Sequence, residues 1–192
     1  MTKVVFRFLA TLLVLCSLPI HASELDLVDM ASERVGLTVR KSPVLYFFMP
    51  QATSLPVRFT LRDERSISPV AEVFLPPPPR AGFWAIRLKD YAIQLDEDVQ
   101  YRWSISIARD PSRNQPDIVS GGVIERIDPQ LVDYYDQACD RDSVLLALKA
   151  GLWVDGFGCL CELVEANPED QKLRGLQEKL WKDMGLDPTD RR

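Results

Sequence analysis

The chain of 192 residues contains one histidine, His21, and it falls inside a predicted secretion signal. Removing that signal leaves no imidazole, which excludes Ser-His-Asp and Cys-His catalysis as well as metal sites built on histidine. The remaining sequence also lacks an apolar run of the ~20 residues that a membrane-spanning helix needs. The full chain has 23 basic and 28 acidic residues, a balance that is not typical of a nucleic-acid-binding protein, and its 46% hydrophobic residues are typical of a folded domain rather than a disordered chain.

The N-terminal segment has the layout of an export signal. Two basic residues and no acid precede an apolar stretch over residues 8–18, and the small residue Ala22 suits a cleavage site. At 11 residues this stretch is shorter than an uncleaved membrane anchor requires. We therefore expect a signal peptide over residues 1–22, cleaved after Ala22, and a leader over 23–33. The mature protein is expected to be periplasmic or secreted and to have no membrane span.

Residues 34–127 follow the two-residue period of β-strands. Between residues 99 and 108, for example, large apolar side chains alternate with polar or small ones. Residues 44–49 are apolar on both faces, which is typical of a central strand covered on both sides. The seven predicted strands cover residues 36–40, 44–49, 57–62, 70–75, 84–89, 99–108 and 118–127. They predict an antiparallel β-sandwich of immunoglobulin or fibronectin type, in which Tyr101 forms the tyrosine corner.

Residues 128–186 follow a helical period and predict a small helical bundle. Asp128 stands directly before a proline and marks a first helix start, and a second helix is expected over 142–150. Asp155 is expected to cap a third helix, and Asn167, again followed by proline, gives the strongest start of all. The residues expected to face inward are Leu131, Tyr135, Ala138, Val144, Leu145, Leu148, Phe157, Leu160, Val164, Leu173, Leu176, Leu180 and Met184.

Residues 142–168 resemble part of a tetratricopeptide repeat. The matching positions are Gly151, Trp153, Gly156, Leu160, Leu163 and Pro168. No second copy follows at the 34-residue period of that repeat, so an array with a long concave groove is excluded. The alternative is a helical hairpin that covers an open end of the sandwich. The last residues, 187–192, are expected to form a disordered tail.

The two halves of the mature chain carry opposite charge. Residues 34–127 contain 13 basic and 10 acidic residues, whereas residues 128–192 contain 8 basic and 14 acidic ones. The change in charge coincides with the change in hydrophobic period and predicts a domain boundary near Asp128. The two halves are expected to attract each other across their interface.

Three cysteines remain after signal cleavage, and their odd number allows at most one internal disulfide. On a helix, Cys159 and Cys161 point about 200° apart, so they are not expected to bridge each other. Either of them is a possible disulfide partner for Cys139 across the helical hairpin. A soft-metal site at Cys159 and Cys161 would need a second pair of thiols or a histidine nearby, so no metal is expected there.

In several predicted strands, basic side chains are at the positions that face away from the core. If those strands are neighbours, they form a basic sheet face for an anionic glycan or for the acidic helical half, and otherwise they form an ordinary solvated face. The residues of this possible binding surface are Arg58, Arg62, Arg87, Lys89 and Arg102. Acidic residues 96–98 lie where a turn is expected, so solvation explains them better than the paired carboxylates of a glycan hydrolase.

The sequence contains several distinctive short segments: residues 36–38 with the aromatic run to Pro50, 101–103, 110–111, 122–126, 151–155 and 166–168. In their order along the chain they resemble the bacterial exported family of domains of unknown function numbered 928. The resemblance implies export and strands followed by helices. The family has no assigned activity, so the resemblance implies no catalytic residue.

The sequence as a whole predicts an exported, non-catalytic binding or assembly module. The expected partner is a protein, and no cofactor or nucleic acid is expected. The alternatives are a carboxylate-based glycan hydrolase and a glycan-binding module. The first requires two acids that face one cleft, and the second requires exposed Trp or Tyr side chains in a row.

Overall fold

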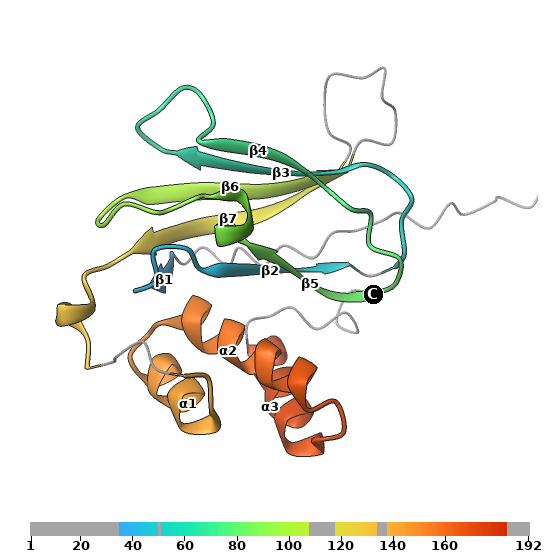
Figure 1. The fold of residues 1–192 in the computed structure, drawn as a ribbon, viewed down its shortest axis with the longest axis vertical. Helices are drawn as coiled ribbons and strands as arrows, with labels where there is room; N and C mark the ends of the chain where they lie inside the picture. Colours follow the sequence, from blue (N-terminus) through green and yellow to red (C-terminus); the bar gives the residue numbers. More distant parts are fainter. Residues whose placement is uncertain (1–34, 50, 108–117, 134–137, 184–192) are drawn as a thin grey trace, which may run out of the picture.

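The computed structural model of the chain describes residues 35–49, 51–107, 118–133 and 138–183, with only the backbone for 118–120. In these ranges the protein is α+β, because seven strands come first and three α-helices follow, as the sequence predicted (Figure 1). The predicted signal peptide, leader and disordered tail lie outside the described residues.

The strands form two sheets, and all seven agree with the predicted segments to within a few residues. They are β1 (Gly36–Thr38), β2 (Val44–Met49), β3 (Val57–Asp63), β4 (Ala71–Leu75), β5 (Gly82–Arg87), β6 (Gln100–Ile107) and β7 (Ile118–Arg126). The larger sheet has the strand order β1-β7-β6-β3-β4, and the smaller sheet pairs β2 with β5. Strand β4 therefore lies at one edge of the larger sheet and β1 at the other.

The larger sheet is mixed, so the prediction of a purely antiparallel arrangement is wrong at one edge. Strand β1 runs parallel to β7, with Gly36 opposite Ile124. The other pairs in this sheet, β7 with β6, β6 with β3 and β3 with β4, are antiparallel. From β1 the chain passes to β2 in the other sheet, so no hairpin links β1 to its neighbour or imposes an antiparallel direction.

The two sheets share one apolar core. Phe47 of β2 and Ile86 of β5 are fully or almost fully buried against Phe59 of β3 and Ile105 of β6. The opposite face of β2 is also buried, because Tyr46 packs into a second core made with the helices. The predicted burial of residues 44–49 on both faces is confirmed, but their strand belongs to a two-stranded sheet and is not central.

Three helices cover the side of β2 and β5 that faces away from the larger sheet (Figure 1). They are α1 (Arg141–Lys149), α2 (Trp153–Ala166) and α3 (Gln171–Asp183). Their core is rich in aromatic rings: the Phe83 and Trp181 centroids lie 4.3 Å apart, and those of Tyr46 and Phe157 lie 5.9 Å apart. In the described part of the chain, no helix combines the length and apolarity that crossing a membrane would take.

The first predicted helix is only a single turn. Asp128 caps it as predicted, because its side chain accepts a hydrogen bond from the Gln130 N–H at 2.9 Å. The turn is the 3₁₀ segment η2 (Pro129–Leu131), after which Val132 is extended. Leu131 is exposed, so the segment buries no apolar side chain that would favour a longer helix. The predicted continuation through Tyr135 lies outside the described residues.

Two of the predicted helix starts are displaced. Helix α2 begins at Trp153, so Asp155 lies inside its first turn and is not its cap. Helix α3 begins three residues after Pro168, and Asp170 accepts hydrogen bonds from two N–H groups of its first turn. Asn167 instead ends α2. A proline that follows a helix end cannot continue that helix, which explains why this Asn-Pro pair separates α2 from α3.

Helix α1 faces the core through a slightly different stripe than predicted. Val144 and Ala147 are fully buried, and Leu148 packs against the helical core, but Leu145 is exposed. Asp140 caps the helix in a capping box with Ser143, and the apolar stripe runs through Val144, Ala147 and Leu148.

The hydroxyl of Tyr101 bonds back to the preceding turn. It accepts a hydrogen bond from the Asp96 N–H at 3.2 Å, while the ring is buried in the core between the sheets. Removing the hydroxyl with Tyr101→Phe is expected to lower the free energy of unfolding by about 1 kcal/mol, the typical net value of one hydrogen bond. Urea denaturation measures it, with Tyr91→Phe at an exposed ring as the control. Equal losses in both variants would contradict a role for the Tyr101 contact.

Candidate functional site

Asp155 is the one acidic residue that the described part of the chain buries. It lies in the first turn of α2, where the positive end of the helix dipole favours a carboxylate. A buried carboxylate needs hydrogen-bond donors to offset the loss of hydration, so its surroundings are the first place to look for chemistry.

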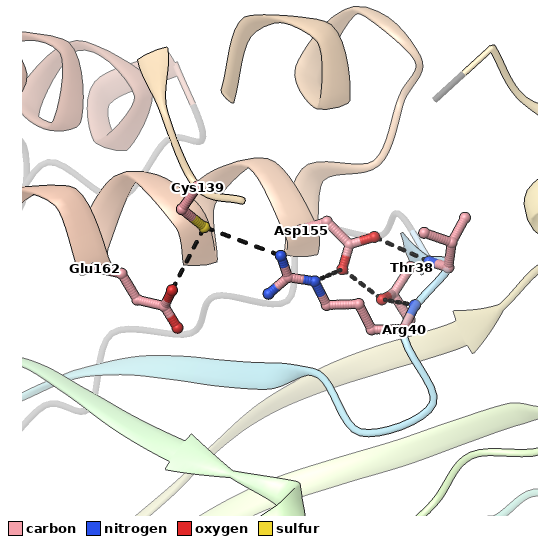
Figure 2. A network of polar contacts seen from close by, with 6 residues as sticks. Thr38, Arg40, Cys139, Asp155 and Glu162 are labelled. Carbon is pink, nitrogen blue, oxygen red and sulfur yellow. Dashed lines mark hydrogen bonds and ion pairs between the residues drawn. The ribbon is translucent and has the colours of Figure 1, made fainter. Parts of the chain in front are cut away.

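The donors to Asp155 come from the end of β1 and the residues that follow it (Figure 2). The Thr38 hydroxyl donates to Oδ1 at 2.5 Å, and the Val39 N–H donates to Oδ2 at 2.9 Å. The guanidinium Nε of Arg40 lies 4.0 Å from Oδ1. The Thr38 hydroxyl oxygen in turn accepts a hydrogen bond from the Arg40 N–H at 3.1 Å. Both carboxylate oxygens are therefore occupied by groups of a single strand end.

The polar network continues from Arg40 to a cysteine and returns to α2. Arg40 Nη2 lies 3.9 Å from the Cys139 sulfur, and the Cys139 thiol donates to Glu162 Oε2 at 3.4 Å (Figure 2). Glu162 follows Asp155 by about two helical turns. The network thus ties β1, the segment before α1 and two points of α2 together.

Two glycines allow the backbones in this region to approach closely. A Cβ atom on Gly36 of β1 would lie 2.8 Å from Cγ2 of Val154 in α2. Gly151 has a φ of 81°, which forms the tight turn between α1 and α2. The segments 36–38 and 151–155, which both carry the family resemblance, therefore meet in space, and Asp155 joins them.

The structure brings three of the five predicted surface cations together. Arg58 and Arg62 of β3 and Arg102 of β6 point from the outer face of the larger sheet, and Arg62 lies directly opposite Arg102. Arg87 belongs to β5 of the other sheet, and its Nη2 lies 3.6 Å from Glu165 of α2. Lys89 lies in the 3₁₀ segment η1 (Leu88–Tyr91).

Acidic neighbours offset the repulsion among these three arginines. Arg58 Nη1 lies 3.4 Å from Glu72 Oε1, and Arg102 Nη2 lies 3.0 Å from Glu64 Oε1. Arg62 Nη1 donates to the Ile67 carbonyl at 3.3 Å. The arginines therefore lie in defined positions, although exposed ion pairs of this kind add little stability.

Exposed apolar side chains lie next to this cationic face. Phe74 of β4 is directly opposite Arg58 and is 70% exposed, and Ile67 in the β3–β4 turn is 97% exposed. Phe74 points outward because it alternates with the inward-facing Val73 and Leu75. We call Phe74, Arg58, Arg62 and Arg102 the outer-face patch.

The acidic segment 96–98 is held against β7. Glu97 forms an ion pair with Arg126, whose Nη1 also donates to the Leu95 carbonyl at 3.2 Å. The Asp98 N–H donates to the Arg126 carbonyl at 2.9 Å. Sequence analysis did not identify Arg126 as the partner of this segment, because an arginine at the end of a strand looks like an ordinary surface residue.

Cys159 and Cys161 lie on different sides of α2. The Cys159 sulfur lies 3.9 Å from the carbonyl oxygen of Asp140, whereas Cys161 accepts a hydrogen bond from Gln177 Nε2 of α3 at 3.2 Å. Burial raises the pKa of each of these helix thiols to about 12. All three are free thiols. Within the described ranges no group of three or more His, Cys, Asp or Glu side chains is placed to hold a metal ion.

Comparison with known proteins identifies a family but no characterised relative. A search of curated proteins finds no match. Residues 21–191 match the family described as Domain of Unknown Function (DUF928), which is the family that the short segments resemble. Because this match covers most of the chain, the protein belongs to the DUF928 family.

Proposed function

We propose that the chain is an exported, non-catalytic module that binds a protein partner through its outer-face patch. The observation that carries the proposal is the combination of an exposed phenylalanine with three arginines on one open sheet face. Aromatic and arginine side chains are enriched where protein interfaces gain most of their binding energy.

The patch defines the chemistry of the partner. Arg62 and Arg102 face each other at the end of the patch away from Phe74, so one carboxylate of the partner can contact both. Phe74 lies at the edge of the sheet, where an apolar side chain of the partner can cover it. The expected partner is therefore a protein segment in which acidic and apolar side chains lie next to each other.

The partners of the acidic side chains support binding over hydrolysis. Asp155 is held by three groups of β1 and the residues after it, and Glu97 is held by Arg126. Glycoside hydrolysis needs two carboxyl groups on opposite sides of a substrate, with separations of about 5 to 9.5 Å. Residues 96–98 bond instead to β7 and Tyr101, which assigns them a role in the fold.

The same proposal includes the finer description of the fold. The core shared by the two sheets and the Tyr101 hydroxyl contact support an immunoglobulin-like sandwich. A tetratricopeptide-like hairpin over residues 142–168 is supported by the close packing of α1 on α2, where a Cβ on Gly156 would lie 2.9 Å from Leu148 Cγ.

A peptide-binding measurement tests the proposed function. The probe is a fluorescein-labelled ten-residue peptide in which glutamate alternates with leucine, and the reference peptide carries lysine in place of glutamate. We expect the full chain to bind the acidic peptide at micromolar concentration and the lysine peptide at least tenfold more weakly. Phe74→Ser and Arg62→Glu are each expected to weaken binding of the acidic peptide roughly tenfold, which is about 1.4 kcal/mol.

Leu131→Ser is the matched control, because Leu131 is 72% exposed, like Phe74, but lies in η2. It is expected to leave peptide binding unchanged. Equal affinity for the two peptides would overturn the proposal. A third outcome is that the chain binds neither peptide but binds a sulfated oligosaccharide, and that Phe74→Ser does not weaken this binding. The partner would then be an anionic glycan and not a protein.

A further inference from the structure

Two thiols meet at the junction between α2 and the segment that precedes α1. Cys139 is half-buried and lies just before Asp140, the N-cap of α1. Cys159 is buried on α2, and its sulfur lies 3.9 Å from the carbonyl oxygen of Asp140, the residue that follows Cys139. Both cysteines belong to the helical core. The Cys139 sulfur reaches the same side of α2, because it lies 3.4 Å from Oε2 of Glu162, which follows Cys159 by about one helical turn.

The third thiol of the helical half faces elsewhere. Cys161 lies two residues after Cys159, which places it on the other side of α2. Its sulfur accepts a hydrogen bond from Gln177 on α3. The arrangement therefore separates the two disulfide alternatives that the sequence left open.

We propose that Cys139 and Cys159 are an oxidisable pair that forms an intramolecular disulfide when it meets a disulfide-containing oxidant such as oxidised glutathione. Cys161 stays a free thiol. The proposal is independent of the outer-face patch, because both cysteines belong to the helical core.

The reaction proceeds by two exchanges. The Cys139 thiolate attacks one sulfur of the oxidant, forms a mixed disulfide and releases one glutathione thiol. The Cys159 thiolate then attacks the Cys139 sulfur, closes the internal disulfide and releases the second glutathione thiol. Both protein protons are lost, and the two electrons reduce the oxidant to two thiols. Cys139 attacks first because it is the more exposed of the two, whereas burial raises the pKa of Cys159.

Oxidation also changes the polar network of Asp155. In the reduced protein the Cys139 thiol donates its proton to Glu162 Oε2. The disulfide has no such proton, so Glu162 loses this hydrogen-bond donor. Its carboxylate then accepts hydrogen bonds from water or from Arg40, which lies near the same sulfur. The disulfide fixes the entry to α1 against α2 and closes a loop of about twenty residues, long enough to restrict the unfolded chain substantially.

Incubation of the full chain with oxidised glutathione, followed by thiol blocking in denaturant and peptide mass mapping, tests the pair. The expected product is a cross-linked peptide pair that joins Cys139 to Cys159, with a mass about 2 Da below the sum of the reduced peptides because two hydrogens are lost. Cys161 is expected to be recovered as a blocked thiol. The melting temperature is expected to rise by roughly 5 °C on oxidation.

Cys139→Ser is expected to abolish both the cross-link and the rise in melting temperature, and its half-buried position makes it a safe change. Cys161→Ser is the matched control and is expected to retain both. A cross-link from Cys139 to Cys161 would overturn the proposal. The proposal would also be overturned if, at the end of the reaction, the wild-type chain carried glutathione on Cys139 and still had Cys159 as a free thiol.

Discussion

Replacing Asp155 by alanine is expected to lower the free energy of unfolding by about 3 kcal/mol. The substitution removes the acceptor for the Thr38 hydroxyl and the Val39 N–H, both of which are buried. It also leaves the Arg40 guanidinium without the carboxylate that lies 4.0 Å away. Buried donors without acceptors cost more than the net value of the hydrogen bonds they made, so the loss is expected to exceed that of an ordinary polar contact.

Urea denaturation followed by tryptophan fluorescence measures the loss. Asp142→Ala serves as the control, because Asp142 is also an acid in the first turn of a helix but is exposed. It is expected to change stability by less than about 0.5 kcal/mol. Thr38→Val, which removes only one of the donors, is expected to cost about 1 kcal/mol. If Asp155→Ala and Asp142→Ala behave alike, Asp155 does not join β1 to α2 in the way that the contacts indicate.

The strands could be predicted from the sequence because their signal is local. The alternation of apolar and polar residues at residues 57–62 and 99–108 reflects which side chains face the core, and both segments form the expected strands. The pairing of strands is not local. Nothing in residues 44–49 distinguishes a central strand from one that is covered by helices on its second face, since both require apolar side chains on both sides.

The helix starts were harder to predict because neighbouring residues compete for the same role. Asn167 and Asp170 both have side chains that cap helices, and only the position of α3 against the core decides between them. Asp155 has the features of a cap as well. Its actual partners, Thr38 and Val39, lie more than a hundred residues earlier in the chain, so no pattern within the helix could indicate them.

The candidate surface was predicted in part for a similar reason. The two-residue period of a strand predicts which side chains face away from the core. This prediction is correct for Arg58, Arg62 and Arg102. Which strands are neighbours depends on the sheet order, and β5 with Arg87 belongs to the smaller sheet. The angle between Cys159 and Cys161 on a helix also followed from the sequence, but which of them lies on the side of Cys139 depends on how α1 packs on α2.

Replacing Gly121 by alanine is expected to destabilise the protein by about 3 kcal/mol, because the added methyl group meets backbone rather than a flexible side chain. Gly121 lies on β7 opposite Ser104 of β6. A Cβ atom there would lie 2.0 Å from the Trp103 carbonyl oxygen and 2.8 Å from the Ser104 Cα. The strands cannot accommodate it without moving apart at the middle of the larger sheet, and this would disrupt the ladder of hydrogen bonds between them.

Gly175→Ala adds the same methyl group where the expected effect has the opposite sign. Gly175 is exposed on α3, and nothing lies within 4 Å of the position of its Cβ. Alanine there is expected to stabilise the protein by about 0.5 to 1 kcal/mol, because glycine costs a helix more backbone entropy than alanine does. Paired urea denaturation curves of the two variants measure the difference. Both substitutions add the same methyl group, so they change hydrophobicity and size identically. A loss of stability at Gly121 together with a gain at Gly175 would therefore be due to the close contact between β6 and β7. A gain of stability in both variants would mean that these strands are farther apart than the register requires.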